Sequence, residues 1–177
     1  MKKILSLLLI LSLLLSGCAL ANGNIKEPVE FFYQRRCTNP DDYKAFFSEG
    51  AICSEPREAS GHREDLYYLL SMYLRGPLDP ELESPFPAGC ALVNVTQERH
   101  ELTVYLNSGA SLLEDLDLNI ACACLAKTCM ALTDVTTVHI ESRNIDNEVL
   151  FSNTITAEGL LLEDGPPVPT QVTNETQ

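Results

Sequence analysis

The chain has 177 residues, a length that suits one domain with a genuine hydrophobic core. Its 25 acidic and 12 basic residues give a net charge of −13, which argues against nucleic-acid binding because phosphate contacts need clustered Lys and Arg. The same charge repels anionic lipid headgroups. A water-facing, soluble surface explains it without any cation-binding role.

The first segment, residues 1–17, has the pattern of a signal peptide. Lys2 and Lys3 supply a basic start, and an apolar stretch follows over residues 4–15. That stretch is too short to span a bilayer core, which needs about 20 apolar residues. We therefore predict a cleaved signal and not a transmembrane helix.

The signal ends in Leu15-Ser16-Gly17-Cys18, which resembles the lipobox of bacterial lipoproteins. The resemblance implies cleavage before Cys18, diacylglycerol on its sulfur and a membrane anchor through that lipid, with residues 18–26 as a tether. The alternative is an ordinary secreted protein with a chance cysteine. Cleavage would leave 10 basic against 25 acidic residues, a net charge of −15.

The segment after the tether mixes strands with a loop. Residues 28–33 predict a strand with Val29, Phe31 and Tyr33 on one face. A loop with a short helix at 42–48 precedes a second strand over 51–59. Cys37 and Cys53 flank this excursion, so a disulfide between them is predicted as one option.

A helix follows, with Ser60 as its expected N-cap. Its apolar residues recur at helical spacing: Leu66, Leu69, Leu70, Tyr73 and Leu74. Gly76-Pro77 ends it, since glycine suits a left-handed cap and proline cannot continue a helix. A proline-rich loop occupies residues 78–88.

The second half predicts a hairpin, a helix and another hairpin, in chain order 91–96, 101–107, 111–133, 135–142 and 149–155. Val93 and Val95 are expected to face inward in the first hairpin. We therefore expect a single two-layer α+β domain over residues 27–163, with two main helices on one face of an antiparallel or mixed sheet. Residues 164–177 are too polar to pack and are expected to form a disordered acidic and polar tail.

Cysteines form the most prominent chemical cluster. Six remain besides Cys18, and in an exported protein they could pair or stay reduced. Three of them, Cys122, Cys124 and Cys129, could begin a zinc site, but Cys122 and Cys124 project about 200° apart on a helix. We expect these thiols to pack as small core residues, with a disulfide, for instance to Cys90, as the alternative.

The remaining candidates for catalysis have simpler explanations. All three histidines, His62, His100 and His139, are expected on the surface. The carboxylates of Glu114, Asp115 and Asp117 could imitate a hydrolase pair, but acidic residues also favour a helix N-terminus. Tyr67, Tyr68 and Tyr73 could stack on a ligand, but they lie on or beside a core-facing stripe. No phosphate-binding or nucleophile-elbow motif occurs.

The order of elements resembles the GerMN domain, found in sporulation and spore-germination lipoproteins. Leu66 to Pro77 looks like the family's helix that ends in Leu-x-x-Gly-Pro, and residues 84–89 resemble its lead into the hairpin 91–107. The resemblance covers about residues 29–160. One copy fits this chain, whereas the family member best known for germination carries two.

The resemblance implies a non-enzymatic binding or assembly module without a cofactor or metal. It predicts an extracytoplasmic lipoprotein, lipid-anchored through Cys18, that binds envelope proteins or itself and does not bind nucleic acid. The envelope process would be sporulation, germination or general envelope assembly. The alternative is a lipoprotein that binds cell wall or a small ligand. An envelope hydrolase is a further, less favoured alternative.

Overall fold

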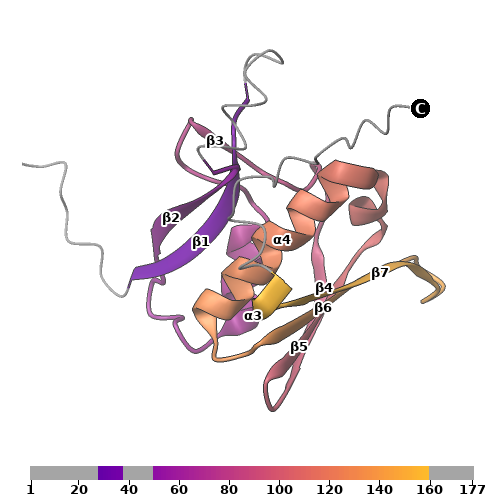
Figure 1. Ribbon diagram of the computed structural model, residues 1–177. Helices are drawn as coiled ribbons and strands as arrows, with labels where there is room; N and C mark the ends of the chain where they lie inside the picture. Colours follow the sequence, from indigo (N-terminus) through magenta and orange to yellow (C-terminus); the bar gives the residue numbers. More distant parts are fainter. Residues whose placement is uncertain (1–27, 38–49, 160–177) are drawn as a thin grey trace, which may run out of the picture.

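The structure is a computed structural model that describes residues 28–37 and 50–159. Several predicted segments lie outside these residues: the signal peptide 1–17, the tether 18–26, the short helix 42–48 and the tail 164–177. The described residues contain two sheets with helices between and beside them (Figure 1).

The smaller sheet is built near the N-terminus, in the strand order β2-β1-β3. Its strands are β1 (Pro28–Arg35), β2 (Ile52–Glu58) and the short β3 (Leu82–Glu83). Both neighbours run antiparallel to β1, and Tyr33 lies opposite Cys53.

The larger sheet has the order β4-β5-β6-β7 and is mixed. Its strands are β4 (Leu92–Glu98), β5 (Glu101–Leu106), β6 (Thr137–Arg143) and β7 (Val149–Thr156). β5 and β6 are parallel, whereas the two outer pairs are antiparallel hairpins. A parallel pair needs a long crossover, which a helix provides here.

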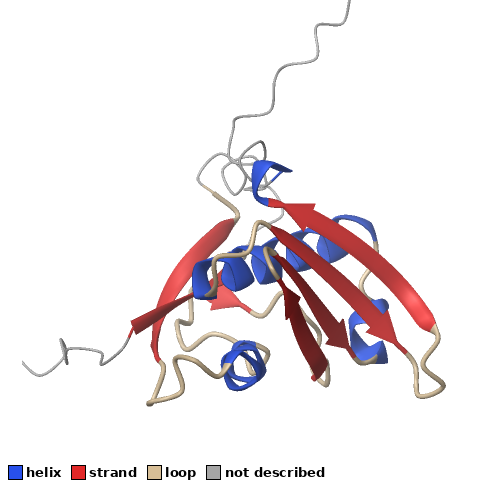
Figure 2. Ribbon diagram, turned by 90° about the horizontal axis from the view of Figure 1, so that it is seen from below, coloured by secondary structure: helices blue, strands red, loops and turns tan. Residues whose placement is uncertain are grey.

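Three helices complete the described part: α3 (Leu66–Tyr73), the 3-10 helix η3 (Ser108–Leu112) and α4 (Asp115–Leu132). α4 is the crossover between β5 and β6, and it lies between the two sheets (Figures 1 and 2). α3 packs beside β4. The expected α+β class with two main helices is confirmed, and the smaller sheet adds a second cover over α4.

The core confirms the predicted inward face of β1. Val29, Phe31 and Tyr33 are buried, and the Tyr33 ring stacks on Tyr73 of α3 with ring centroids 4.9 Å apart. Phe31 meets the Tyr73 ring edge-on at 5.7 Å. This aromatic cluster ties the first strand to α3, because such ring pairs add to the free energy gained from area burial.

The first helix starts later than predicted, and Ser60 is not its cap. Ser60 has φ +52° and Gly61 has φ +78°, so both residues lie in a left-handed turn and not at the head of a helix. Asp65 is the N-cap instead, and its carboxylate accepts from the Tyr68 amide at 2.9 Å. The prediction was wrong because the turn chemistry of Ser60-Gly61 prevailed over the capping preference of serine.

A buried carboxylate explains the chain reversal after α3. Glu55 of β2 accepts from the amides of Leu78 and Asp79 at 2.8 and 2.7 Å, and from Arg57 Nη1 at 3.0 Å. Arg57 also donates to the Gly76 carbonyl at 3.2 Å. The Gly76-Pro77 turn is therefore held by side chains of β2, which are distant in sequence.

The second helix also begins later, at Asp115 instead of residue 111, because η3 occupies the preceding turn. Burial extends all round the helix over residues 120–126. Two sheets enclose this stretch, which consists mostly of alanine and cysteine.

One inward position of β4 was predicted wrongly. Val93 is 57% exposed, whereas Leu92 is buried. The pairing with β5 shifts register between Leu92 and Asn94, so a bulge turns Val93 out of the alternation.

Candidate functional site

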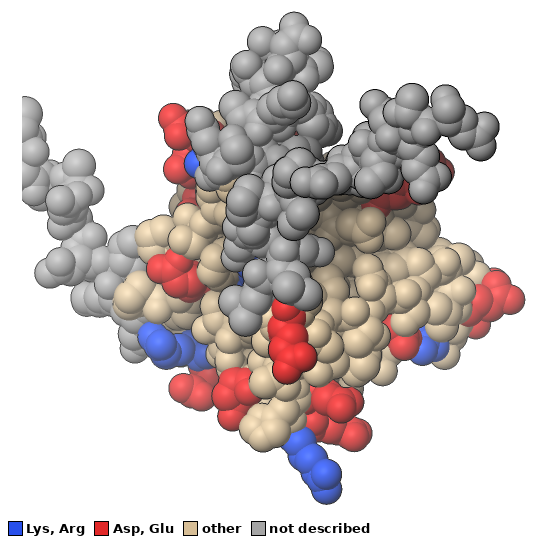
Figure 3. All heavy atoms as spheres, in the orientation of Figure 1, with Lys and Arg blue, Asp and Glu red and all other residues tan. Residues whose placement is uncertain are grey.

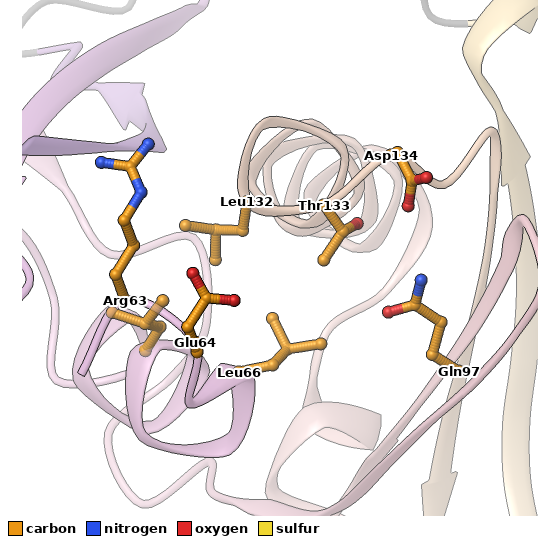
Figure 4. Close-up of a pocket in the computed structure, with 8 residues that line it drawn as sticks. Arg63, Glu64, Leu66, Gln97, Leu132, Thr133 and Asp134 are labelled. Carbon is orange, nitrogen blue, oxygen red and sulfur yellow. The ribbon is translucent and has the colours of Figure 1, made fainter.

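A pocket of about 240 Å³ opens where the start of α3, the end of β4 and the end of α4 meet (Figure 4). It is the candidate ligand site of the described residues. Its lining consists of three leucines and five polar residues: Arg63, Glu64, Leu66, Leu69, Gln97, Leu132, Thr133 and Asp134.

The local structure determines how these side chains reach the pocket. Glu64 precedes the Asp65 cap of α3, and Asp134 follows the Thr133 cap of α4, so both come from helix ends. Gln97 lies opposite Leu102 in the β4–β5 register and therefore points to the helix side of the sheet. Figure 4 shows the Glu64 carboxylate and the Gln97 amide directed into the space between these elements.

The pocket lining carries more negative than positive charge. Glu64 and Asp134 contribute two carboxylates, whereas Arg63, the lining cation, donates to the Pro28 carbonyl at 3.2 Å. The Thr133 hydroxyl donates to the Cys129 carbonyl at 2.7 Å and closes the end of α4. The arrangement can hold a small molecule with an apolar body and a cationic end.

The histidines occupy separate places on the surface. His62 stacks on Tyr68 at 4.0 Å, and His100 Nδ1 lies 3.4 Å from the Asp134 carbonyl. His139 Nδ1 lies 2.9 Å from Thr154 Oγ1, and its Nε2 lies 3.4 Å from Glu101. The expectation that all three are surface residues agrees with these positions.

The thiols of the second half are core groups, as expected. Cys90, Cys122, Cys124 and Cys129 are buried and free. Burial raises the pKa of Cys90 to about 12 and that of Cys122 to about 11, and it raises the pKa values of Cys124 and Cys129 further. Such thiols stay protonated and are poor nucleophiles.

No group of three or more potential metal ligands comes together among the described residues. Although Cys122 and Cys124 project from opposite sides of α4, both are buried because each side of the helix faces a sheet.

The Cys37–Cys53 disulfide stays a prediction. Both residues are half-buried cysteines in the structure. Cys53 pairs with Tyr33, four residues before Cys37, so a bond between the two cysteines would require the end of β1 to move relative to β2. Cys18 lies outside the described residues, and its lipidation likewise stays a prediction.

The carboxylates and tyrosines that were weighed as site residues lie at a helix start, in the core or beside it. Glu114 is the N-cap residue of α4, and Asp115 and Asp117 lie in its first turn, where acidic side chains favour the helix. Tyr73 is a core residue. Tyr67 is 47% exposed, and its hydroxyl donates to the Leu92 carbonyl at 3.3 Å.

Sequence reasoning missed the pocket as a site. Its residues come from three segments far apart in the chain, and neither Gln97 nor Asp134 was among the predicted site residues. No local motif links them. The signal that could have suggested them is two acidic residues at opposite ends of the two main helices, but the closeness of those ends is a property of the fold.

None of the helices in the described ranges is long and apolar enough to cross a membrane.

No protein-family model matches the chain, and no curated protein does either. A solved structure of the tandem GerMN domains of the sporulation protein GerM from Bacillus subtilis is similar, with a TM-score of 0.51 and 14% sequence identity. The match covers 79% of this chain and 49% of that one, so the chain spans about half the length of its structural neighbour. At this identity the likeness concerns the fold, and the chain has a GerMN-like fold.

Proposed function

We propose that this chain is an extracytoplasmic lipoprotein, anchored through Cys18, whose GerMN-like domain binds protein partners in envelope assembly linked to sporulation or germination. The observation that carries the proposal is the GerMN-like fold, because the structural neighbour is a sporulation protein with two such domains. The domain would act by binding and positioning, without catalysis.

The sequence supports the location. Residues 1–17 have the pattern of a signal peptide, and Leu15-Ser16-Gly17-Cys18 places a cysteine directly after small residues. Because the chain carries a net negative charge, the lipid and not the protein surface would supply the attraction to an anionic membrane. The domain would then face partners close to the membrane.

In-cell crosslinking of the full chain tests the assembly role. A photoreactive residue is placed at Val93, which is exposed, and at Leu92, which is buried beside it and serves as the control. The proposal predicts discrete crosslinked products with envelope proteins or with a second copy in the membrane fraction. A chain that stays strictly monomeric and crosslinks to no envelope protein from any exposed position would contradict it.

The pocket favours a second candidate function, a lipoprotein that binds a small cationic ligand. Glu64 and Asp134 line the pocket together with three leucines and one cation, Arg63. Titration of the full chain with lysine and with norleucine, whose side chain lacks the ammonium group, followed by NMR, would test this function. Lysine-specific shifts that Glu64→Gln and Asp134→Asn remove would support it, and identical responses to both compounds would contradict it.

A further inference from the structure

The outer edge of β7 is open among the described residues. β7 is last in the order β4-β5-β6-β7, and no strand of the described residues lies beyond it. Its sequence, Val-Leu-Phe-Ser-Asn-Thr-Ile-Thr, contains no proline and no charged residue. Proteins usually block exposed edges with lysine, proline or inward charges, because a free edge pairs with other chains.

The register identifies which backbone groups are free. The Ala157 amide donates to the Thr136 carbonyl at 2.9 Å, on the β6 side. Because pairing alternates along an antiparallel strand, Asn153 and Ile155 also direct their backbone groups toward β6. The groups of Ser152, Thr154 and Thr156 therefore point outward and present donors and acceptors for another strand.

Apolar side chains mark one end of this edge. Val149 is 50% exposed and Leu150 is 43% exposed, and Ile145 in the preceding turn is 99% exposed. The pairing with β6 is irregular next to Arg143, which is where β7 begins. An incoming strand could cover the valine and leucine as it adds to the edge.

The charges around the edge are negative. Asp146 and Glu148 lie in the β6–β7 turn, and Glu158 follows the strand. Figure 3 shows the red carboxylate residues at the tip of this hairpin. The nearest cation, Arg143, is already paired with Glu141 at 2.6 Å. In an antiparallel pair of two β7 strands, acidic ends would meet acidic ends, which disfavours a second copy as the occupant.

We propose that β7 binds an extended segment of a partner protein, which adds to the sheet as a fifth strand and carries Lys or Arg near its ends. Backbone hydrogen bonds to Ser152, Thr154 and Thr156 supply the pairing. Apolar residues cover Val149 and Leu150, and the basic ends complement Asp146, Glu148 and Glu158. This inference rests on the proposed function as a protein-binding module and names the surface and the kind of partner.

The test selects ten-residue peptides from a random displayed library against the full chain in nonionic detergent. We expect selected peptides to alternate β-branched or aromatic residues and to carry basic ends. Ser152→Pro removes an outward amide and should weaken their binding about tenfold or more, whereas Ser152→Ala keeps that amide and should change it less than about twofold.

A charge-reversed variant keeps the test decisive if Ser152→Pro is poorly folded. The double variant Asp146→Lys, Glu148→Lys changes only turn residues. It should weaken the binding of basic peptides several-fold at low salt and much less at high salt. Peptides without basic ends, or peptides that bind Ser152→Pro as well as the parent chain, would overturn the proposal. A dimer that Ser152→Pro abolishes would also overturn it, because the occupant would be a second copy. Loss of peptide binding alone, with in-cell crosslinks intact, would overturn this inference and leave the proposed function standing.

Discussion

The amide of Phe32 in β1 donates to the hydroxyl of Thr128 in α4, with 2.9 Å between nitrogen and oxygen. The same hydroxyl donates to the Cys124 carbonyl at 2.9 Å, and Thr128 is fully buried. This amide points away from β2, toward the other edge of β1. The short β3 pairs there only with Gln34 and Arg35, so it leaves the Phe32 amide unpaired by a strand. One threonine thus joins the smaller sheet to the helix between the sheets.

Replacing Thr128 with valine keeps the shape of the side chain and removes the hydroxyl. The Phe32 amide then has no acceptor in a partly buried place, so we expect the free energy of unfolding to fall by about 1–3 kcal/mol. Urea denaturation followed by circular dichroism measures the change. Thr96→Val on the exposed face of β4 is the matched control and should stay within about 0.5 kcal/mol of the parent. Equal stability of the two variants would show that this bond is dispensable.

Replacing Glu55 with glutamine should loosen the turn after α3. The carboxylate accepts from two backbone amides and from Arg57, so its loss removes charge-assisted bonds and leaves Arg57 without its ion-pair partner. We expect a loss of about 2–4 kcal/mol, and faster hydrogen exchange at the Leu78 and Asp79 amides. Glu58→Gln, at an exposed position of the same strand, should show neither effect.

Replacing Gly109 with alanine should destabilise the start of η3. A methyl group there would lie 3.1 Å from the Cys90 backbone and 3.0 Å from the Asn107 amide oxygen. That oxygen accepts from the amides of Ala91 and Gly109, both at 3.1 Å, so the backbone around it cannot easily move. We expect a loss of about 1–3 kcal/mol by thermal or urea denaturation. Gly159→Ala, where the added group has 3.5 Å to Thr156, is the control and should be nearly neutral.

The buried thiols predict a loss of stability at alkaline pH. Burial raises the pKa of Cys122 from its ordinary value of 9.0 to about 11 in the folded chain. Between these two values the unfolded chain has lost the proton that the folded chain retains, so stability is full below pH 9 and falls as the pH rises toward 11. Urea midpoints at a series of pH values measure the slope. Cys122→Ala should reduce the slope without abolishing it, because Cys90, Cys124 and Cys129 act in the same direction. A midpoint of the parent chain that is constant over this range would contradict the prediction.

The sequence predicts the strands well where apolar and polar residues alternate. Phe31 and Tyr33 in β1 were expected to be buried and are, and the same alternation buries Leu102 and Val104 in β5 and Val138 and Ile140 in β6. These positions follow from alternation alone, because the side-chain period of a strand is two.

The wrong predictions concern features that the spacing of apolar residues does not show. Val93 is exposed because of a one-residue bulge, and Ser60 fails as a cap because of its left-handed turn with Gly61. The complete burial of the middle of α4 depends on a second sheet on its other side. The dense run of small residues at 121–124 is consistent with such close packing, but it does not say what the packing partner is.

The pocket could not be predicted from the sequence either. Glu64 and Asp134 could be recognised as acidic residues at helix ends, but their common pocket depends on how α3 and α4 meet. The free edge of β7 was equally hidden, because the sequence does not show how the two hairpins join into one sheet, β4-β5-β6-β7, or which strands become its edges.

Membrane fractionation of the chain with Cys18→Ala tests the central claim most directly. We propose that a lipid on this cysteine keeps a GerMN-like binding domain at the outer face of the membrane. The parent chain should sediment with membranes, and Cys18→Ala should appear in the soluble fraction or remain as unprocessed precursor with residues 1–17 attached, which intact mass distinguishes. A variant that is processed and still sediments with membranes as fully as the parent would contradict the account.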